Sequence, residues 1–192
     1  MRFVLLAAAA VALSTSAFAA PKWTADYAKS HLQFDGAFGQ NKVTGTFAKY
    51  TADVAFDKAD LATSKITVTV DMKTATTKVA PDAIYEKPTD GALPGAGWFN
   101  TAAFATAKFE STAITSKGGD NYEAKGKLTI RGVTKEIALP FSVKVTGNTA
   151  VAEGKVTVSR IDFGIKGDSP QYSLPKPVPF DVAISFSISA TR

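Results

Sequence analysis

Two alternating runs that meet at a short link, between Tyr122 and Val145, constrain the fold of this chain more than any other feature. Apolar or small residues occupy every second position from Tyr122 to Ile130, and again from Ile137 to Val145. A period of two is typical of a strand with one dry face and one solvated face. The segment Arg131–Lys135 is short enough to join the two strands as a hairpin, with Gly132 free to take a positive φ.

Similar rows recur along the chain, and the second run of the hairpin exceeds the usual strand length of about five to six residues. The other rows are Leu32–Phe34, Val43–Phe47, Ile66–Met72 and Val182–Ile188. No helix long enough for a parallel crossover separates these rows. The sequence therefore predicts a mainly β fold, an antiparallel eight-stranded up-and-down barrel, with a two-sheet sandwich as the alternative. Two segments, Pro81–Tyr85 and Trp98–Phe104, predict one or two short helices.

The first nineteen residues are typical of a secretory signal peptide. A positive charge at Arg2 precedes the apolar run Phe3–Leu13, and an A-x-A pattern ends at Ala19. We expect cleavage after Ala19, because the apolar run is shorter than the roughly twenty residues that span a bilayer. Residues 20–192 are then one domain. The sequence contains no cysteine, so this domain depends on core packing and strand pairing rather than on disulfides.

The charge of the chain does not indicate a nucleic-acid partner. The formal net charge is +5, but the lysines are scattered singly through the predicted strands and turns. Nucleic-acid binding requires a concentrated basic patch. Isolated lysines on strands instead discourage edge-to-edge pairing between molecules. We therefore expect no nucleic-acid binding.

The sequence contains little that indicates catalysis. Its single histidine, His31, cannot form a typical zinc site in a chain without cysteine, and no nucleophile elbow is present. We expect His31 to be a half-buried polar residue on a strand. A calcium site at Asp57 and Asp60 lacks the dense ligand spacing of a known calcium loop. We predict no catalytic residues, no metal and no cofactor, and keep a lipid-modifying hydrolase dependent on His31 as a minority hypothesis.

The aromatic residues indicate what the barrel interior does. The sequence has 13 phenylalanines, many of them at inward strand positions. An eight-stranded barrel either fills its interior with side chains or holds one small apolar ligand. Gly36, Gly45 and Gly126 interrupt rows that are otherwise apolar. We expect these glycines to leave space for a cavity.

Several motifs together resemble a known family. They are Trp23–Asp26, Val43–Phe47, Phe56–Asp57 with Leu61 and Ser64, Trp98–Asn100 with Phe104, Phe109–Thr112, Gly126–Lys135 and Arg160–Ile165. On the basis of these motifs, essentially the whole mature chain resembles the YceI-like family of exported polyisoprenoid-binding proteins, which have a lipocalin-like barrel. The sequence departs from the family in having Lys29–Ser30 in place of an early His-Ser pair and Phe38 in place of a later histidine. Contacts that those histidines make to a ligand head group are therefore not expected here.

The resemblance implies that a long isoprenoid lipid, of polyprenyl or quinone type, binds inside the barrel for storage or transport in the bacterial periplasm. The expected lining residues are Leu32, Phe34, Phe47, Val68, Val70, Leu128, Ile130, Leu139, Phe141 and Phe186, with Trp98, Phe99 and Phe163 as a mouth or lid. Transient contact with a membrane and a homodimer are kept as further expectations. The alternative is a non-lipid module that binds a membrane redox protein of the envelope or acts in stress response.

Overall fold

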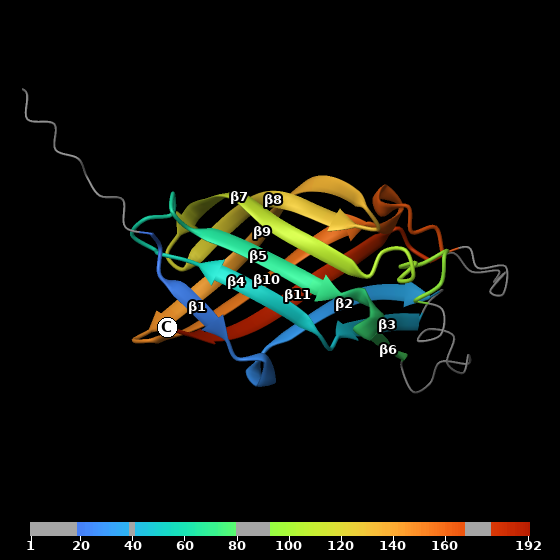
Figure 1. The fold of residues 1–192 in the computed structure, drawn as a ribbon, viewed down its shortest axis with the longest axis horizontal. Coiled ribbons are helices and arrows are strands. Elements are labelled where there is room, and N and C mark those ends of the chain that lie inside the picture. Colours follow the sequence, from blue (N-terminus) through green and yellow to red (C-terminus); the bar gives the residue numbers. More distant parts are fainter. Residues whose placement is uncertain (1–18, 39–40, 80–92, 168–177) are drawn as a thin grey trace, which may run out of the picture.

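The computed structural model describes residues 19–38, 41–79, 93–167 and 178–192. The predicted signal peptide, apart from Ala19, and the predicted helical turn at Pro81–Tyr85 lie outside these residues. Within them, the secondary structure is β-strands joined by turns and three short 3₁₀ helices (Figure 1). The strands are β1 (Lys22–Ala25), β2 (His31–Phe38), β3 (Asn41–Phe47), β4 (Tyr50–Ala55), β5 (Lys65–Asp71), β6 (Ala75–Val79), β7 (Thr106–Gly118), β8 (Asn121–Ile130), β9 (Val133–Thr146), β10 (Thr149–Ser159) and β11 (Asp181–Thr191). The 3₁₀ helices are η1 (Tyr27–Lys29), η2 (Met72–Thr74) and η3 (Arg160–Phe163).

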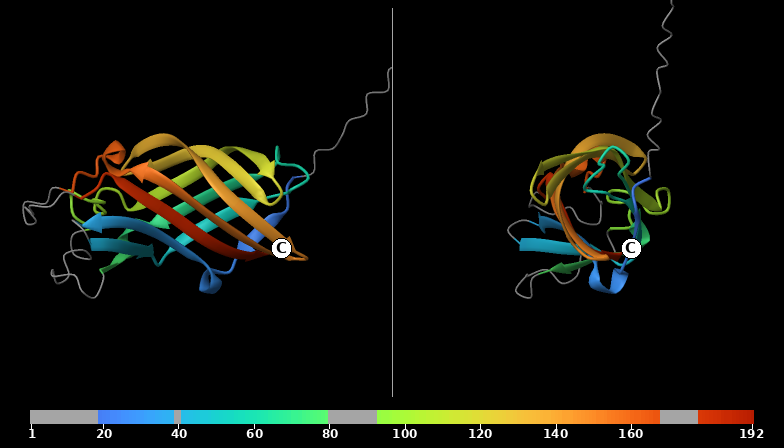
Figure 2. Two further views of the ribbon diagram at one scale, coloured as in Figure 1. Left: turned by 180° about the vertical axis from the view of Figure 1, so that it is seen from behind. Right: turned by 90° about the vertical axis from the view of Figure 1, so that its left-hand side faces the viewer.

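Eight strands pair into a closed antiparallel ring. The order around the ring is β1-β4-β5-β7-β8-β9-β10-β11, and β11 pairs with β1 to close it. The closing contacts join Thr24 to Thr191 and Ala25 to Ala190. The end-on view in Figure 2 shows the strands curving round into this barrel. The predicted eight-stranded antiparallel barrel is confirmed, and the sandwich alternative is wrong.

The three remaining strands extend the ring at one end. β2 follows β1 after η1, and β6 follows β5 after η2. β3 precedes β4, with residues 48–49 between them. β2 pairs with β11, and β3 pairs with both β2 and β6 (Figures 1 and 2). The pairing of β5 with β7 ends at Asp71 and Thr106. Beyond that point, among the described residues, β6 has no strand partner on its second edge, so the wall is interrupted there.

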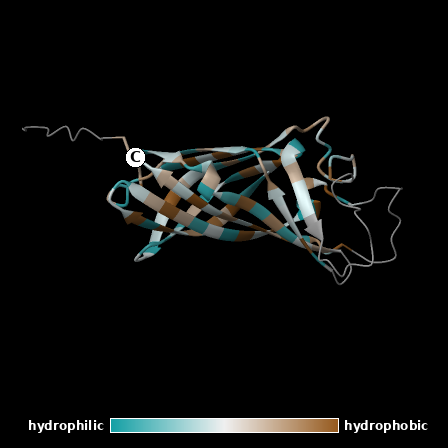
Figure 3. Ribbon diagram, turned by 90° about the horizontal axis from the view of Figure 1, so that it is seen from below, coloured by the Kyte–Doolittle hydropathy of each residue, from teal (hydrophilic) through white to brown (hydrophobic). Residues whose placement is uncertain are grey.

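The hairpin predicted around Gly132 is present, with a shorter link than expected. Only Arg131 and Gly132 connect β8 to β9, and both have positive φ, 51° and 72°. Two residues with positive φ match the twist of the flanking strands, so the strands continue to the turn. The predicted inward row from Tyr122 to Ile130 is buried at every second position. Figure 3 shows the same alternation of hydrophobic and hydrophilic bands along the strands.

The predicted helix at Trp98–Phe104 is a succession of turns. The Asn100 N–H donates to the Gly95 carbonyl, and the Phe104 N–H donates to the Asn100 carbonyl, each at 2.9 Å. Asn100 has φ 49°, a left-handed conformation that ends a helix after one turn. The short helices of the described chain are the 3₁₀ turns instead. Asp26 and Asp71 cap η1 and η2 through their carboxylates. No helix among the described residues is long and apolar enough to cross a membrane.

Aromatic side chains pack tightly at the barrel end that carries β1, called here the Trp23 end. The Phe56 ring meets the Tyr122 ring edge-on at 5.1 Å between centroids, and the Phe141 ring lies 5.6 Å from Tyr122. The Trp23 indole N–H donates to the Phe56 carbonyl at 3.0 Å. Trp23, Phe56, Tyr122 and Phe141 are all at most 7% exposed. This end is therefore a packed core. The opposite end carries η3 and the Arg131–Gly132 turn, and is called the η3 end.

Candidate functional site

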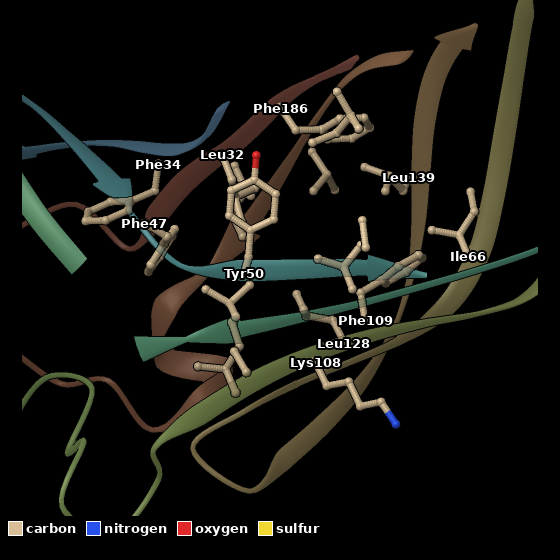
Figure 4. Close-up of a pocket in the computed structure, with 18 of the residues that line it drawn as sticks. Leu32, Phe34, Phe47, Tyr50, Ile66, Lys108, Phe109, Leu128, Leu139 and Phe186 are labelled. Carbon is tan, nitrogen blue, oxygen red and sulfur yellow. The ribbon is translucent and has the colours of Figure 1, made fainter. Parts of the chain in front are cut away.

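A cavity of about 260 Å³ lies inside the barrel. Side chains from every strand of the ring line it, and they are almost all aliphatic or aromatic (Figure 4). Lys108 and Arg160 are the two charged residues on its wall. The Lys108 ammonium group pairs with Glu110 at 2.9 Å, and Figure 4 shows it directed away from the labelled apolar side chains. The site is thus suited to an apolar ligand and has no arrangement for a charged one among these groups.

The structure brings together all the residues predicted to form the site. The thirteen predicted residues that lie on the cavity wall are Leu32, Phe34, Phe47, Val68, Val70, Trp98, Phe99, Leu128, Ile130, Leu139, Phe141, Phe163 and Phe186. They come from six strands, from η3 and from the segment before β7. Their contact with a ligand stays a prediction.

Three of these rings form a cluster beside the interrupted part of the wall. Phe34 of β2 and Phe47 of β3 have centroids 5.3 Å apart, and Phe99 meets Phe34 edge-on at 6.0 Å. Phe99 belongs to the succession of turns at Trp98–Phe104. Phe163, which also lines the cavity, belongs to η3 and is 2% exposed. Aromatic side chains therefore border the cavity where strand pairing stops.

The predicted role of the glycines is wrong in two of three cases. A Cβ at Gly45 would collide with the Phe34 ring, and one at Gly126 would lie 2.7 Å from the Phe109 ring. Gly154, which the sequence analysis did not single out, is covered in the same way by Phe186. Of the three predicted glycines, Gly36 alone has nothing within 4 Å of an added Cβ. At Gly45, Gly126 and Gly154, the absence of a side chain lets a ring from the neighbouring strand lie against the barrel wall. These rings therefore do not fill the centre of the barrel.

Arg160 and Tyr50 are among the lining residues with polar groups that the sequence analysis missed. Arg160 is 7% exposed and donates from Nε to Pro179, from Nη1 to Ile165 and from Nη2 to Val178, at 3.0, 2.5 and 2.9 Å to the three carbonyl oxygens. Nothing in its spacing predicts this role. Tyr50 is the first residue of an inward row with Ala52 and Val54, and this period could have identified it. Burial raises the pKa of the Tyr50 phenol, nearby Tyr27 raises it further, and the Ser30 hydroxyl opposes the shift.

The candidate catalytic and metal groups lie elsewhere. His31 is exposed on β2 opposite Ser187 and is not on the cavity wall, so the expectation that it is half-buried is wrong. The carboxylates of Asp57 and Asp60 accept hydrogen bonds from the backbone N–H groups of Ala59 and Ala62. They stabilise the β4–β5 loop. The described ranges contain no cluster of three metal-ligating side chains.

Comparison with known proteins places this barrel in a family. The family model described as a YceI-like domain matches residues 23–190. The chain belongs to the YceI-like family. A UPF0312 protein of Pseudomonas fluorescens is 34% identical over 157 residues, which are 76% of this chain and 72% of that protein. The expected resemblance is therefore confirmed.

Solved structures have the same barrel. BcnA of Burkholderia cenocepacia is 28% identical and superposes with a TM-score of 0.75, over 88% of this chain and all of BcnA. A domain of Saccharophagus degradans, described as polyisoprenoid-binding and implicated in plant cell wall breakdown, superposes with a TM-score of 0.66 over 88% of this chain and 97% of that domain. At 13% identity, this second likeness shows the fold alone.

Proposed function

We propose that this YceI-like barrel binds the tail of a long-chain isoprenoid lipid, of polyprenyl or quinone type. The apolar cavity inside a closed barrel is the observation that carries the proposal. The Saccharophagus degradans domain described as polyisoprenoid-binding adds support, because it has this fold. The cavity also favours lipid binding over the alternative of an envelope interaction module, which needs no internal space.

The energetics of burial are compatible with a branched hydrocarbon tail. Each buried methylene contributes about 0.8 kcal/mol, so one isoprene unit contributes roughly 3–4 kcal/mol before the costs of association. The cavity of about 260 Å³ is close to the lower limit of roughly 300–1,000 Å³ for sites of drug-sized ligands. Only part of a long tail therefore fits in the cavity, unless the tail widens it. Among the described residues, the β5–β7 pairing ends at Asp71 and Thr106, so widening the barrel beyond that point breaks no further pairing of these two strands.

The proposed role is storage or transport, without catalysis, in the periplasm. The predicted signal peptide supports the location. The wall of the cavity is apolar, and its two charged residues, Lys108 and Arg160, are engaged with Glu110 and with backbone carbonyls, which supports binding rather than bond cleavage. Contact with a membrane and formation of a homodimer stay predictions.

A series of prenols that differ by whole isoprene units tests the proposal. For geraniol, farnesol, geranylgeraniol and longer prenols, we expect the affinity to rise with each unit until the cavity is full and then to level off. Displacement of a fluorescent apolar probe measures each affinity. A straight-chain alcohol of matched carbon number is the control for general hydrophobic partition. Equal affinity for short and long prenols would contradict the proposal.

A further inference from the structure

The pairing of β9 with β10 stops part-way along both strands. The register ends where Phe141 of β9 lies opposite Gly154 of β10. Beyond that point, residues 133–140 of β9 pair with β8 alone, and residues 155–159 of β10 pair with β11 alone. In the described chain, no backbone ladder joins these two stretches. The barrel wall therefore has a seam at the η3 end, called here the β9–β10 seam.

A proline explains where the seam begins. In an antiparallel pair, every second pair of opposed residues exchanges both backbone hydrogen bonds. Counting from Thr146 and Thr149, which flank the two-residue turn, the fourth such pair is Pro140 with Lys155. Proline has no N–H to donate, so this pair cannot form both bonds. A Cβ at Gly154 would lie 2.8 Å from the Pro140 carbonyl oxygen, so the two backbones are in contact just where their pairing ends.

The two edges of the seam lead directly into the cavity. Ile137 and Leu139 on β9, and Val156 and Val158 on β10, line its wall. All four side chains are partly exposed. Separation of the two edges would therefore connect the cavity with the outside through an apolar passage.

The 3₁₀ helix η3 lies at the open end of the seam. It continues from β10 and contacts β9 (Figures 1 and 2). Its Phe163 side chain lines the cavity and is 2% exposed, and the following Ile165 lines the cavity and is 6% exposed. Side-chain packing thus closes the wall here, where a backbone ladder closes it between paired strands.

Arg131 ties the β8–β9 turn to the chain that leaves η3. Its Nη1 donates to the carbonyl oxygens of Gly164 and Trp98, at 2.7 Å each. Arg131 has a φ of 51°, a left-handed conformation that is costly for residues other than glycine. Gly164 has a φ of 68°, so the chain leaves η3 at a residue that can change its backbone angles readily. Opening the seam then requires that Arg131 releases Gly164, with no row of backbone bonds to break.

We propose that a lipid tail enters and leaves the cavity sideways, through the β9–β10 seam, when η3 moves away from β9 and Arg131 releases Gly164. This inference rests on the proposed function and adds the route of exchange. A seam that opens along its length admits a long chain without end-on threading. Because entry and exit share one opening, a change in the seam alters both rates by the same factor and leaves the equilibrium affinity unchanged.

A cross-link across the seam tests the route. The sequence has no cysteine, so the double variant Ala138→Cys, Thr157→Cys carries two unique thiols. Both positions are exposed and alternate with the lining residues of the two edges. Bifunctional methanethiosulfonates of graded length join the thiols, and stopped-flow fluorescence follows uptake and release of N-phenylnaphthylamine. We expect the link to slow both rates at least about tenfold, with the affinity within about twofold of wild type. Dithiothreitol should restore both rates.

The paired half of the same two strands supplies the control. Lys144 and Val151 are exposed and lie opposite each other in the β9–β10 ladder. The same link in Lys144→Cys, Val151→Cys joins strands that are already paired, so both rates should stay at the wild-type values. Wild-type rates in the linked seam would place the route elsewhere and overturn the inference. Equal slowing by the two links would also overturn it, because the effect would not depend on the seam.

Arg131→Asn tests the contact that holds the seam shut. Asn-Gly is favoured in two-residue turns with positive φ at both positions, so the hairpin is kept while the guanidinium is lost. Uptake and release should both become about tenfold faster at unchanged affinity, as expected for losing a charged hydrogen bond. Circular dichroism checks the fold of each variant. Wild-type rates in a folded Arg131→Asn protein would overturn the role of Arg131. Wild-type protein that does not bind the probe would overturn the proposed function as well.

Discussion

Replacing Ala152 with phenylalanine should lower the affinity for isoprenoids at least tenfold while the protein stays folded. Ala152 lies on β10 between Val143 of β9 and Ile188 of β11, and its side chain is on the cavity wall. A benzyl group at this position occupies space that a tail needs. Because the ring enters an existing apolar cavity of about 260 Å³, it avoids most of the overpacking cost of about 1–3 kcal/mol for a filled core. Titration with geranylgeraniol measures the affinity, and thermal unfolding measures the stability.

The neighbouring position supplies the control for this variant. Val151 is on the same strand but faces outward and is 41% exposed. Val151→Phe adds a ring to the outer face of the barrel and should leave the affinity within about twofold of the wild-type value, as is usual for surface changes. Retained affinity in a folded Ala152→Phe protein would show that the tail does not bind in the cavity.

Replacing Arg160 with methionine should lower the free energy of unfolding by about 3–5 kcal/mol, because buried carbonyls lose a charged donor. The guanidinium joins the segment after η3 to the segment before β11 through its bonds to Ile165, Val178 and Pro179. Methionine keeps the apolar stem of the side chain and removes its donors. Urea denaturation measures the change. Since Gly167 also bonds to Gly97, loss of this anchor should loosen the Trp98 segment as well.

Arg192→Met separates this effect from the loss of a cation–π contact. The Arg160 guanidinium lies 5.4 Å from the Phe180 ring centre, and the Arg192 guanidinium lies 5.0 Å from that of Trp23. Arg192 is exposed near the end of the chain, so its replacement should cost no more than about 1 kcal/mol. An Arg160→Met protein as stable as Arg192→Met would show that the carbonyl contacts contribute little.

The barrel and its lining could be predicted from the sequence because both follow from a period of two. On β5, the rows of Ile66, Val68 and Val70 point inward and identify lining residues by position alone. The same rule extended to β4 would have found Tyr50. Side-chain alternation is a local property, so the inward-facing residues can be predicted without knowing which strands are neighbours.

Features that depend on contacts between distant segments could not be predicted. The Phe34 ring covers Gly45 because the pairing of β2 with β3 places these two residues opposite each other. A glycine that was expected to leave empty space therefore makes room for an aromatic ring. Arg160 donates to carbonyls 18 and 19 residues further along the chain, and no spacing in the sequence indicates them. The prediction of a helix at Trp98–Phe104 is wrong because Asn100 adopts a left-handed conformation, which favours turns.

The most direct test of the account is the organic extract of the protein purified from cells of its own organism, analysed by mass spectrometry. The wild-type extract should contain an isoprenoid lipid, enriched over an equal mass of Ala152→Phe protein. Wild-type protein that yields no isoprenoid, or no more than the Ala152→Phe protein, would contradict the claim that the barrel is a lipid-binding site.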